Sequence, residues 1–149
     1  MSTYSAVFKG AAGTNLLPFA GIRSGSTGHI IVREIKVFNQ GSLSAIIRVA
    51  RITTVGTSTG LTAKEHNEGG PPPLGTAVHT YTSTGPTIEA GDVDIGMVGA
   101  AVGSGFHYTY YGEGRGLYIP LAASSAVGIV LVEDVDTANT YSGAFVWEE

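Results

Sequence analysis

Short alternations of apolar and polar residues run along most of the chain, and glycine or proline interrupts them about every ten residues. Such spacing is typical of a sandwich or barrel of short strands. The three longest segments without glycine or proline, residues 29–40, 42–55 and 129–142, are rich in Ile, Val or Thr. These β-branched residues lose rotamer freedom in a helix and pack well on a pleated sheet. The pattern therefore predicts an all-β protein.

We expect a single domain over residues 1–149, a β-sandwich or jelly roll of about eight to nine short antiparallel strands. No linker divides the chain, and no repeat of fixed period is present. The expected strands cover residues 3–9, 30–38, 45–54, 77–83, 92–98, 106–111, 117–121, 126–132 and 141–147.

Alternate residues in the C-terminal half form apolar stripes, which predict the side of each strand that faces the core. Stripes of this kind would fill the space between two packed sheets. They are Val93, Ile95 and Met97; Phe106, Tyr108 and Tyr110; Leu117, Ile119 and Leu121; Val127, Ile129 and Leu131; and Tyr141, Phe145 and Trp147.

Two segments of the N-terminal half are apolar on both sides. Residues 30–38 place Ile, Val or Phe on each face, together with the charged residues Arg33, Glu34 and Lys36. In residues 45–54, arginines on opposite faces each stand among apolar neighbours. A strand that is apolar on both faces is usually covered on both faces. The second cover is either another subunit or a long loop of the same chain.

Residues 63–75, Ala-Lys-Glu-His-Asn-Glu-Gly-Gly-Pro-Pro-Pro-Leu-Gly, are the clearest loop. Its three consecutive prolines favour extended polyproline geometry and cannot occupy a central strand. We expect a Pro-rich loop that projects from the domain. It either contacts a neighbouring protein or is a solvated connection.

Charged residues make up only 13% of the chain, and they are unevenly distributed. Residues 1–64 hold seven of the eight Lys and Arg residues, whereas residues 65–149 hold eleven of the twelve acidic residues. Either the two halves pack together in one fold, or identical subunits make a complementary contact, or a basic face binds nucleic acid. The net charge of −4 does not indicate a nucleic-acid partner, and we expect none.

Further features of the sequence bear on possible partners and chemistry. No run of 18 apolar residues exists, so we expect no membrane partner. Residues 1–4 lack a basic segment followed by an apolar one, so we expect no signal peptide. The absence of cysteine excludes disulfides, thiolate metal sites and cysteine nucleophiles.

Candidate metal ligands are scattered. His29, His66, His79 and His107 show no metal-binding spacing. The carboxylate pairs Asp92/Asp94 and Asp134/Asp136 resemble calcium ligands but lack the full loop pattern, so we read them as acidic strand ends and turns. We therefore expect no metal and no cofactor.

Candidate catalytic residues are equally few. Residues 56–60 spell the Gly-x-Ser-x-Gly elbow of hydrolases around Ser58. That elbow needs a helix after the serine, and the Pro-rich loop follows instead. We therefore expect no enzyme. The aromatic run 106–111 predicts a core stripe, with His107 and Tyr111 on the opposite face.

Several short motifs occur in order along the last two thirds of the chain. They are Arg51-Ile-Thr-Thr-Val-Gly-Thr-Ser-Thr-Gly-Leu-Thr-Ala63, Asp94-Ile95, Phe106-His-Tyr-Thr109, Gly114-Arg-Gly-Leu-Tyr-Ile-Pro120, Ala123-Ser-Ser-Ala-Val-Gly-Ile129 and Phe145-Val-Trp-Glu-Glu149. In these motifs the chain resembles the family of small tailed-bacteriophage proteins that decorate or cement the capsid. The fourth motif is similar to that family's Gly-Gly-x-Leu-x-Ile-Pro pattern, and the last to its aromatic, doubly acidic terminus.

The resemblance implies a β-sandwich or jelly-roll subunit that forms a homotrimer on the outer surface of a phage head. The implied partner is the major capsid protein, and the implied function is to stabilise the head. The protein would be made in the host cytoplasm, and a chain without cysteine suits that reducing compartment. Many copies would make individually modest contacts strong.

Candidate subunit or capsid contacts come from the basic half, the Pro-rich loop and the aromatic run. They are Arg33, Arg48, Arg51, Lys64, Pro71, Pro72, Pro73 and Tyr111. The alternative function is a carbohydrate-binding module, or a fibre or head-fibre protein for host attachment. It would use exposed aromatic residues such as Tyr108, Tyr110, Tyr111 and Tyr118.

Overall fold

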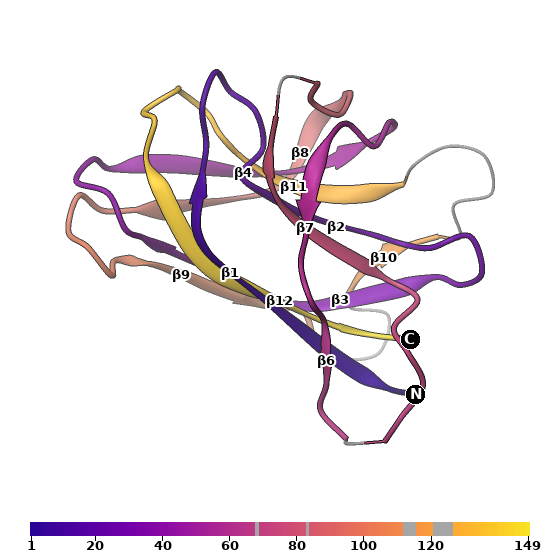
Figure 1. The fold of residues 1–149 in the computed structure, drawn as a ribbon. Coiled ribbons are helices and arrows are strands. Elements are labelled where there is room, and N and C mark those ends of the chain that lie inside the picture. Colours follow the sequence, from indigo (N-terminus) through magenta and orange to yellow (C-terminus); the bar gives the residue numbers. More distant parts are fainter. Residues whose placement is uncertain (68, 83, 112–115, 121–126) are drawn as a thin grey trace.

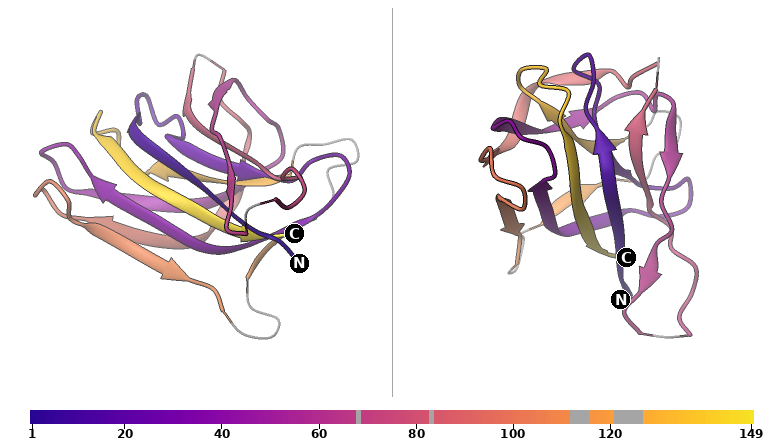
Figure 2. Two further views of the ribbon diagram at one scale, coloured as in Figure 1. Left: turned by 60° about the horizontal axis from the view of Figure 1, so that its bottom comes forward. Right: turned by 60° about the vertical axis from the view of Figure 1, so that its left-hand side comes forward.

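Two antiparallel six-stranded sheets pack against each other, which confirms the predicted all-β sandwich (Figures 1 and 2). The computed structural model describes residues 1–67, 69–82, 84–111, 116–120 and 127–149. No helix that could span a membrane occurs in these ranges. The first and last strands are neighbours, and the two chain ends lie side by side (Figure 1).

Sheet A contains β1 (Thr3–Ala12), β3 (Ile30–Asn39), β6 (Lys64–Glu65), β9 (Gly105–Thr109), β10 (Leu117–Ile119) and β12 (Thr140–Glu148). Its order is β10-β3-β12-β1-β6, and β9 also pairs with β3. Sheet B contains β2 (Ala20–Arg23), β4 (Ala45–Ile52), β5 (Ser58–Gly60), β7 (Thr76–Tyr81), β8 (Ile88–Val98) and β11 (Gly128–Glu133). Its order is β5-β7-β2-β11-β4-β8. Each sheet therefore combines strands from both halves of the chain.

Each of the nine predicted strands has a counterpart among the described residues. The predicted positions 83, 121 and 126 lie outside them, as does most of the glycine-rich turn at 112–116. Three strands, β2, β5 and β6, were not predicted. They are two to four residues long, too short for an alternation to be visible in the sequence.

Aromatic rings fill the centre of the core between the sheets. Phe8 on β1 packs against Phe145 on β12, and Phe19 packs against both Phe8 and Tyr141. Trp147 is also fully buried, and its ring stacks on Tyr4 with a centroid separation of 5.8 Å. The predicted apolar stripe of β12 is therefore confirmed.

The predicted core face of β8 is wrong. Val93, Ile95 and Met97 are exposed, and the opposite face of the strand points inward. Gly96 is buried on that inner face, and the Phe106 ring from β9 occupies the place where a side chain at Gly96 would be. The Phe106 ring thus fills the core beside Gly96, and Val98 is the next residue of β8 that is buried in the core.

A β-bulge explains why β3 reads as apolar on both faces. Glu34 pairs with Val146, but the next residue of β12, Trp147, pairs with Val32, so Arg33 is an extra residue in β3. A bulge shifts the inward positions by one residue. Ile30 and Val32 face the core before it, and Ile35 and Val37 face the core after it.

The outer face of sheet B is covered over only part of its area. Ala50 and Ile52 of β4 join a second buried cluster with Val130 of β11, against which Leu17 and Ile88 pack. For this part of the sheet the same chain supplies the second cover, which is the second of the two alternatives that the sequence leaves open. The start of β4 is different, because Ile46 on the same face is exposed.

Candidate interaction surfaces

The eight predicted contact residues lie in four separate places. They are Arg33 and Tyr111 on the outer face of sheet A, Arg48 on the outer face of sheet B, Arg51 beside the Tyr118 carbonyl of β10, and Lys64 with Pro71, Pro72 and Pro73 around β6. The fold does not gather them into a single surface.

Glu34 organises the outer face of sheet A next to β9. Its Oε2 atom lies 2.9 Å from His107 Nε2 and 3.2 Å from Lys36 Nζ, and its Oε1 atom accepts a hydrogen bond from the Tyr111 hydroxyl. These contacts, the Tyr111 hydrogen bond foremost, lower the pKa of Glu34, although burial acts in the opposite direction. The Tyr111 ring is exposed, but its hydroxyl is already occupied within the chain.

Arg33, the bulge residue, is fixed by β12. Its Nη2 and Nε atoms lie 2.7 and 2.8 Å from Glu148 Oε2, and its Nη1 atom donates to the Tyr110 carbonyl at 3.4 Å. The side chain is mostly buried in this pair. Arg33 therefore joins β12 to the end of β9 within the chain.

A hollow of about 320 Å³ lies over β12 on the outer face of sheet A. The small residues 142–144 form its floor, and Val7 and Lys9 of β1 flank it on one side. Lys36 and Phe38 of β3 flank it on the other. Val7 and Phe38 are exposed. We call this hollow and its four flanking residues the basic groove.

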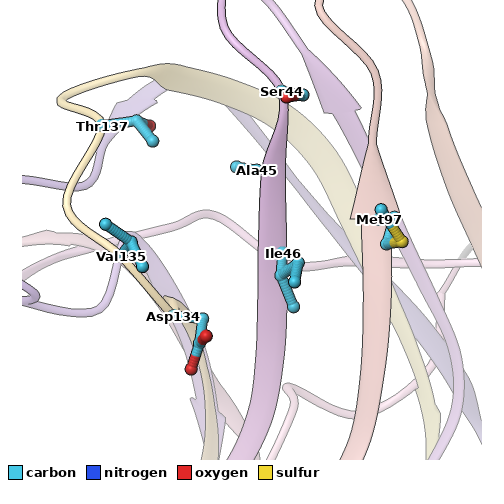
Figure 3. Close-up of a pocket in the computed structure, with 7 residues that line it drawn as sticks. All are labelled: Ser44, Ala45, Ile46, Met97, Asp134, Val135 and Thr137. Atoms are coloured by element: carbon cyan, nitrogen blue, oxygen red, sulfur yellow. The ribbon is translucent and has the colours of Figure 1, made fainter.

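Apolar side chains protrude from the outer face of sheet B at its β8 edge. Met97 is 66% and Ile95 53% exposed, and Ile46 lies directly across from Met97 on β4. Val135, which is 68% exposed, and Asp134 face them from the segment after β11, across a hollow of about 280 Å³ (Figure 3). We call these five residues the acidic ridge.

Arg48 lies beside the acidic ridge and is paired within the chain. Its Nη2 atom lies 2.9 Å from Asp92 Oδ1, and its Nε atom donates to both carboxylate oxygens of Asp92. This hydrogen bond, with the nearby carboxylate of Asp134, raises the pKa of Arg48. The surroundings of the ridge thus hold two carboxylates and one guanidinium group.

The free edge of β8 is closed to another strand at Ile95. The Ile95 N–H donates to Asp94 Oδ1 at 2.9 Å, and the Ile95 carbonyl accepts from the Tyr108 hydroxyl. One position along, the Tyr110 hydroxyl donates to Asp94 Oδ2. Occupied backbone groups cannot pair with an added strand. At Ile95 a contact with another molecule is therefore left to the outer face of the sheet.

The Pro-rich segment is attached to the rest of the fold by hydrogen bonds near its start and near its end, and the three prolines between are exposed. Lys64 lies in β6, which pairs with β1. The Tyr4 hydroxyl donates to the Pro71 carbonyl at 2.6 Å. Glu149 accepts hydrogen bonds from the backbone N–H groups of Leu74 and Gly75 and from the Trp147 indole. Pro71, Pro72 and Pro73 are all exposed.

The aromatic residues of the alternative function do not form one platform. Tyr108 and Tyr110 are half-buried and use their hydroxyls to hold β8, as described above. Tyr111 and Tyr118 are exposed. Tyr118 packs on His29 with a centroid separation of 5.2 Å. Sugar-binding surfaces rely on exposed rings. The two exposed rings here are separate, because Tyr111 follows the end of β9 and Tyr118 lies in β10.

The acidic residues predicted at strand ends and turns have partners within the chain, but Asp92 and Asp94 lie inside β8 rather than at its end. Asp92 pairs with Arg48, and Asp136 accepts backbone hydrogen bonds from Asn15 and Ala138. Within the ranges that the structure covers, no three His, Cys, Asp or Glu residues come together as metal ligands. Ser58 begins the short strand β5.

The sequence did not single out the apolar residues of the two surfaces. The sequence pattern predicts a core position for Ile95 and Met97. It does not predict contacts for the other apolar residues, Val7, Phe38, Ile46 and Val135. One feature of the sequence indicates the ridge: residues 45–54 are apolar on both faces, and the chain covers the second face only in part. Which part stays open depends on where distant segments pack.

No protein-family model, curated protein or solved structure matches this chain.

Proposed function

We propose that the chain is a structural virion protein that binds the outer surface of a phage head as a homotrimer and stabilises it. The observation that carries this proposal is the acidic ridge, a group of exposed apolar side chains at the β8 edge of sheet B and in the segment after β11. Exposed apolar groups of this kind mark protein-binding surfaces. The motifs that resemble capsid decoration proteins support the same function.

The chemistry of the surface also favours binding over catalysis. Charged groups on both outer faces, Glu34 and Arg33 on sheet A and Arg48 on sheet B, are held in ion pairs within the chain. Preformed pairs on β-strands need little reordering when a partner binds. On a head with many sites, such modest contacts add up to firm attachment. The major capsid protein is the proposed partner.

Sedimentation with phage heads tests this function. Heads of the encoding phage that lack the chain are mixed with purified protein and pelleted. We expect saturable binding and a higher temperature of DNA release. Heads that neither bind the chain nor gain stability would refute the proposal. Glycan binding that Tyr111→Ala weakens would instead support the host-attachment alternative.

The role of Arg48 can be separated from its ion pair. Arg48→Glu places two carboxylates together, whereas the double variant R48E/D92R restores a pair with reversed order. If Arg48 contacts a neighbour, both variants lose trimerisation or head binding. If its role is only to hold Asp92, the double variant recovers. Unchanged behaviour of the single variant removes Arg48 from the interface.

A further inference from the structure

The two sheets present outer surfaces of opposite charge. The basic groove is a hollow with Lys9 and Lys36 at its sides. The acidic ridge consists of exposed apolar side chains beside a second, smaller hollow, and it carries Asp134. Both combine exposed apolar side chains with charge at the margin. This arrangement is typical of binding surfaces, with an apolar centre and a polar rim.

The charges remain opposite after internal pairing is counted. Lys36 shares its charge with Glu34, whereas Lys9 is exposed on the other side of the groove. Near the ridge, Arg48 is paired with Asp92, which leaves the exposed Asp134 in excess. The groove is thus net positive and the ridge net negative. Such complementarity fixes the orientation and speeds the encounter of two surfaces.

The floor of the groove suits an apolar side chain. Residues 142–144 are Ser, Gly and Ala, so β12 leaves an open strip between the larger residues of β1 and β3. Met97 is the most exposed of the large apolar residues of β8, and its flexible side chain adapts to irregular surfaces. Because Ile95 closes the β8 edge to strand addition, Met97 would enter the groove from the sheet face.

We propose that the acidic ridge of one copy of this chain docks in the basic groove of the next copy. Met97 and Ile95 lie over residues 142–144, and Lys9 faces Asp134. This self-contact goes beyond the proposed function and does not depend on binding to a head. It also gives the unequal charge of the two chain halves an intermolecular role.

The contact joins two different surfaces, so every copy keeps one of each available. A heterologous contact of this type either closes into a ring or continues as an open chain. A ring of three has a mass of about 46 kDa, three times the 15.3 kDa of the chain. The trimer of the proposed function requires the ring, whereas the self-contact is satisfied by either form.

Two variants, each blocking one surface, test the contact. Met97→Lys places a positive charge on the ridge, and Val7→Glu places a negative charge in the groove. We expect each variant to raise the self-dissociation constant at least tenfold in light scattering on a sizing column. An equimolar mixture of the two variants should associate again. The unchanged ridge of the Val7→Glu chain then docks in the unchanged groove of the Met97→Lys chain. Val102→Lys, at a 73% exposed position outside both surfaces, is the matched control.

The outcomes separate the self-contact from the proposed function. Wild-type protein that stays a 15.3 kDa monomer at every concentration overturns the self-contact. So does association that Met97→Lys abolishes and Val7→Glu leaves intact, because the ridge would then contact another ridge. Far-UV circular dichroism checks that each variant is folded. Association that follows the expected pattern, without head binding, refutes only the proposed function.

Discussion

At the scale of single residues, close packing depends on glycines that lie beneath aromatic rings. A Cβ atom at Gly143 would stand 2.7 Å from Phe8 Cζ and would overlap the Lys36 carbonyl oxygen on the neighbouring strand. Gly96 is covered by Phe106 in the same way. The rings compensate for the missing side chains of these strand glycines. Neither position tolerates a larger residue without a shift of the backbone or of a core ring.

Gly143→Ala should lower the free energy of unfolding by about 2–3 kcal/mol, because overpacking a core displaces rings and backbone. Urea denaturation measures this change. Gly60→Ala is the control, since a Cβ atom there meets nothing within 4 Å. Its effect should stay within about 0.5 kcal/mol. Equal effects of the two substitutions would contradict the packing described for Gly143.

The Glu34 cluster makes a prediction about acid stability. Folding lowers the pKa of Glu34 below its ordinary 4.5, so its contribution to stability is present above that value and is lost as pH falls through the folded value. Tyr111→Phe removes the largest stabilising contact, so the pKa of Glu34 should rise. A carbon-detected NMR titration measures it. Tyr118→Phe is the control and should leave the pKa of Glu34 unchanged.

At the scale of elements, the alternation of side chains predicted strands better than it predicted their faces. All nine predicted strands are present because long runs of Ile, Val and Thr leave few other choices. The predicted core face of β8 was the wrong one, because the Phe106 ring of β9 fills the core beside Gly96. The bulge at Arg33 was also hidden, since a one-residue shift looks in the sequence like a strand apolar on both sides.

The candidate surfaces were less predictable than the strands. The outward direction of Tyr111 followed from alternation, because it depends only on neighbouring residues. The partner of Arg48 could not be predicted, since Asp92 lies 44 positions along the chain. The exposure of Ile46 depends on how far the segments beyond β4 extend over sheet B. Contacts of this range are set by the whole fold.

The Glu149 carboxylate holds the end of the Pro-rich segment by hydrogen bonds, and the strength of this attachment can be tested. Glu149→Ala removes the acceptor for the Leu74 and Gly75 N–H groups. Their hydrogen exchange should become at least tenfold faster, with a loss of about 1–2 kcal/mol in global stability. Exchange measured by mass spectrometry or NMR reports this. Glu89→Ala, at an exposed position, should change neither quantity.

At the scale of the whole molecule, the unequal charge of the two chain halves is partly balanced inside the fold. Arg33 pairs with Glu148, and Arg48 pairs with Asp92, so each pair joins the basic half to the acidic half. Each sheet contains strands of both halves. The first interpretation of the charge pattern therefore applies to these residues, whereas Lys9 and Asp134 are the charges that the proposed self-contact uses.

The shared aromatic core predicts that both sheets unfold together. Phe19 precedes β2 of sheet B, and its ring lies 4.3 Å from that of Tyr141 and 6.0 Å from that of Phe8, both in sheet A. Phe19→Ala should therefore cost about 3–5 kcal/mol of unfolding free energy. Leu16→Ala, at a 48% exposed position, should cost less than about 1 kcal/mol.

Fluorescence of Trp147 and far-UV circular dichroism should report one transition in the wild-type protein and in both variants. Trp147 is the single tryptophan, and its fully buried ring lies in sheet A. Circular dichroism reports the strands of both sheets. Because Phe19 connects the sheets, its removal should shift both signals to lower denaturant by the same amount. Separate transitions would show that sheet B unfolds independently and would contradict a single shared core.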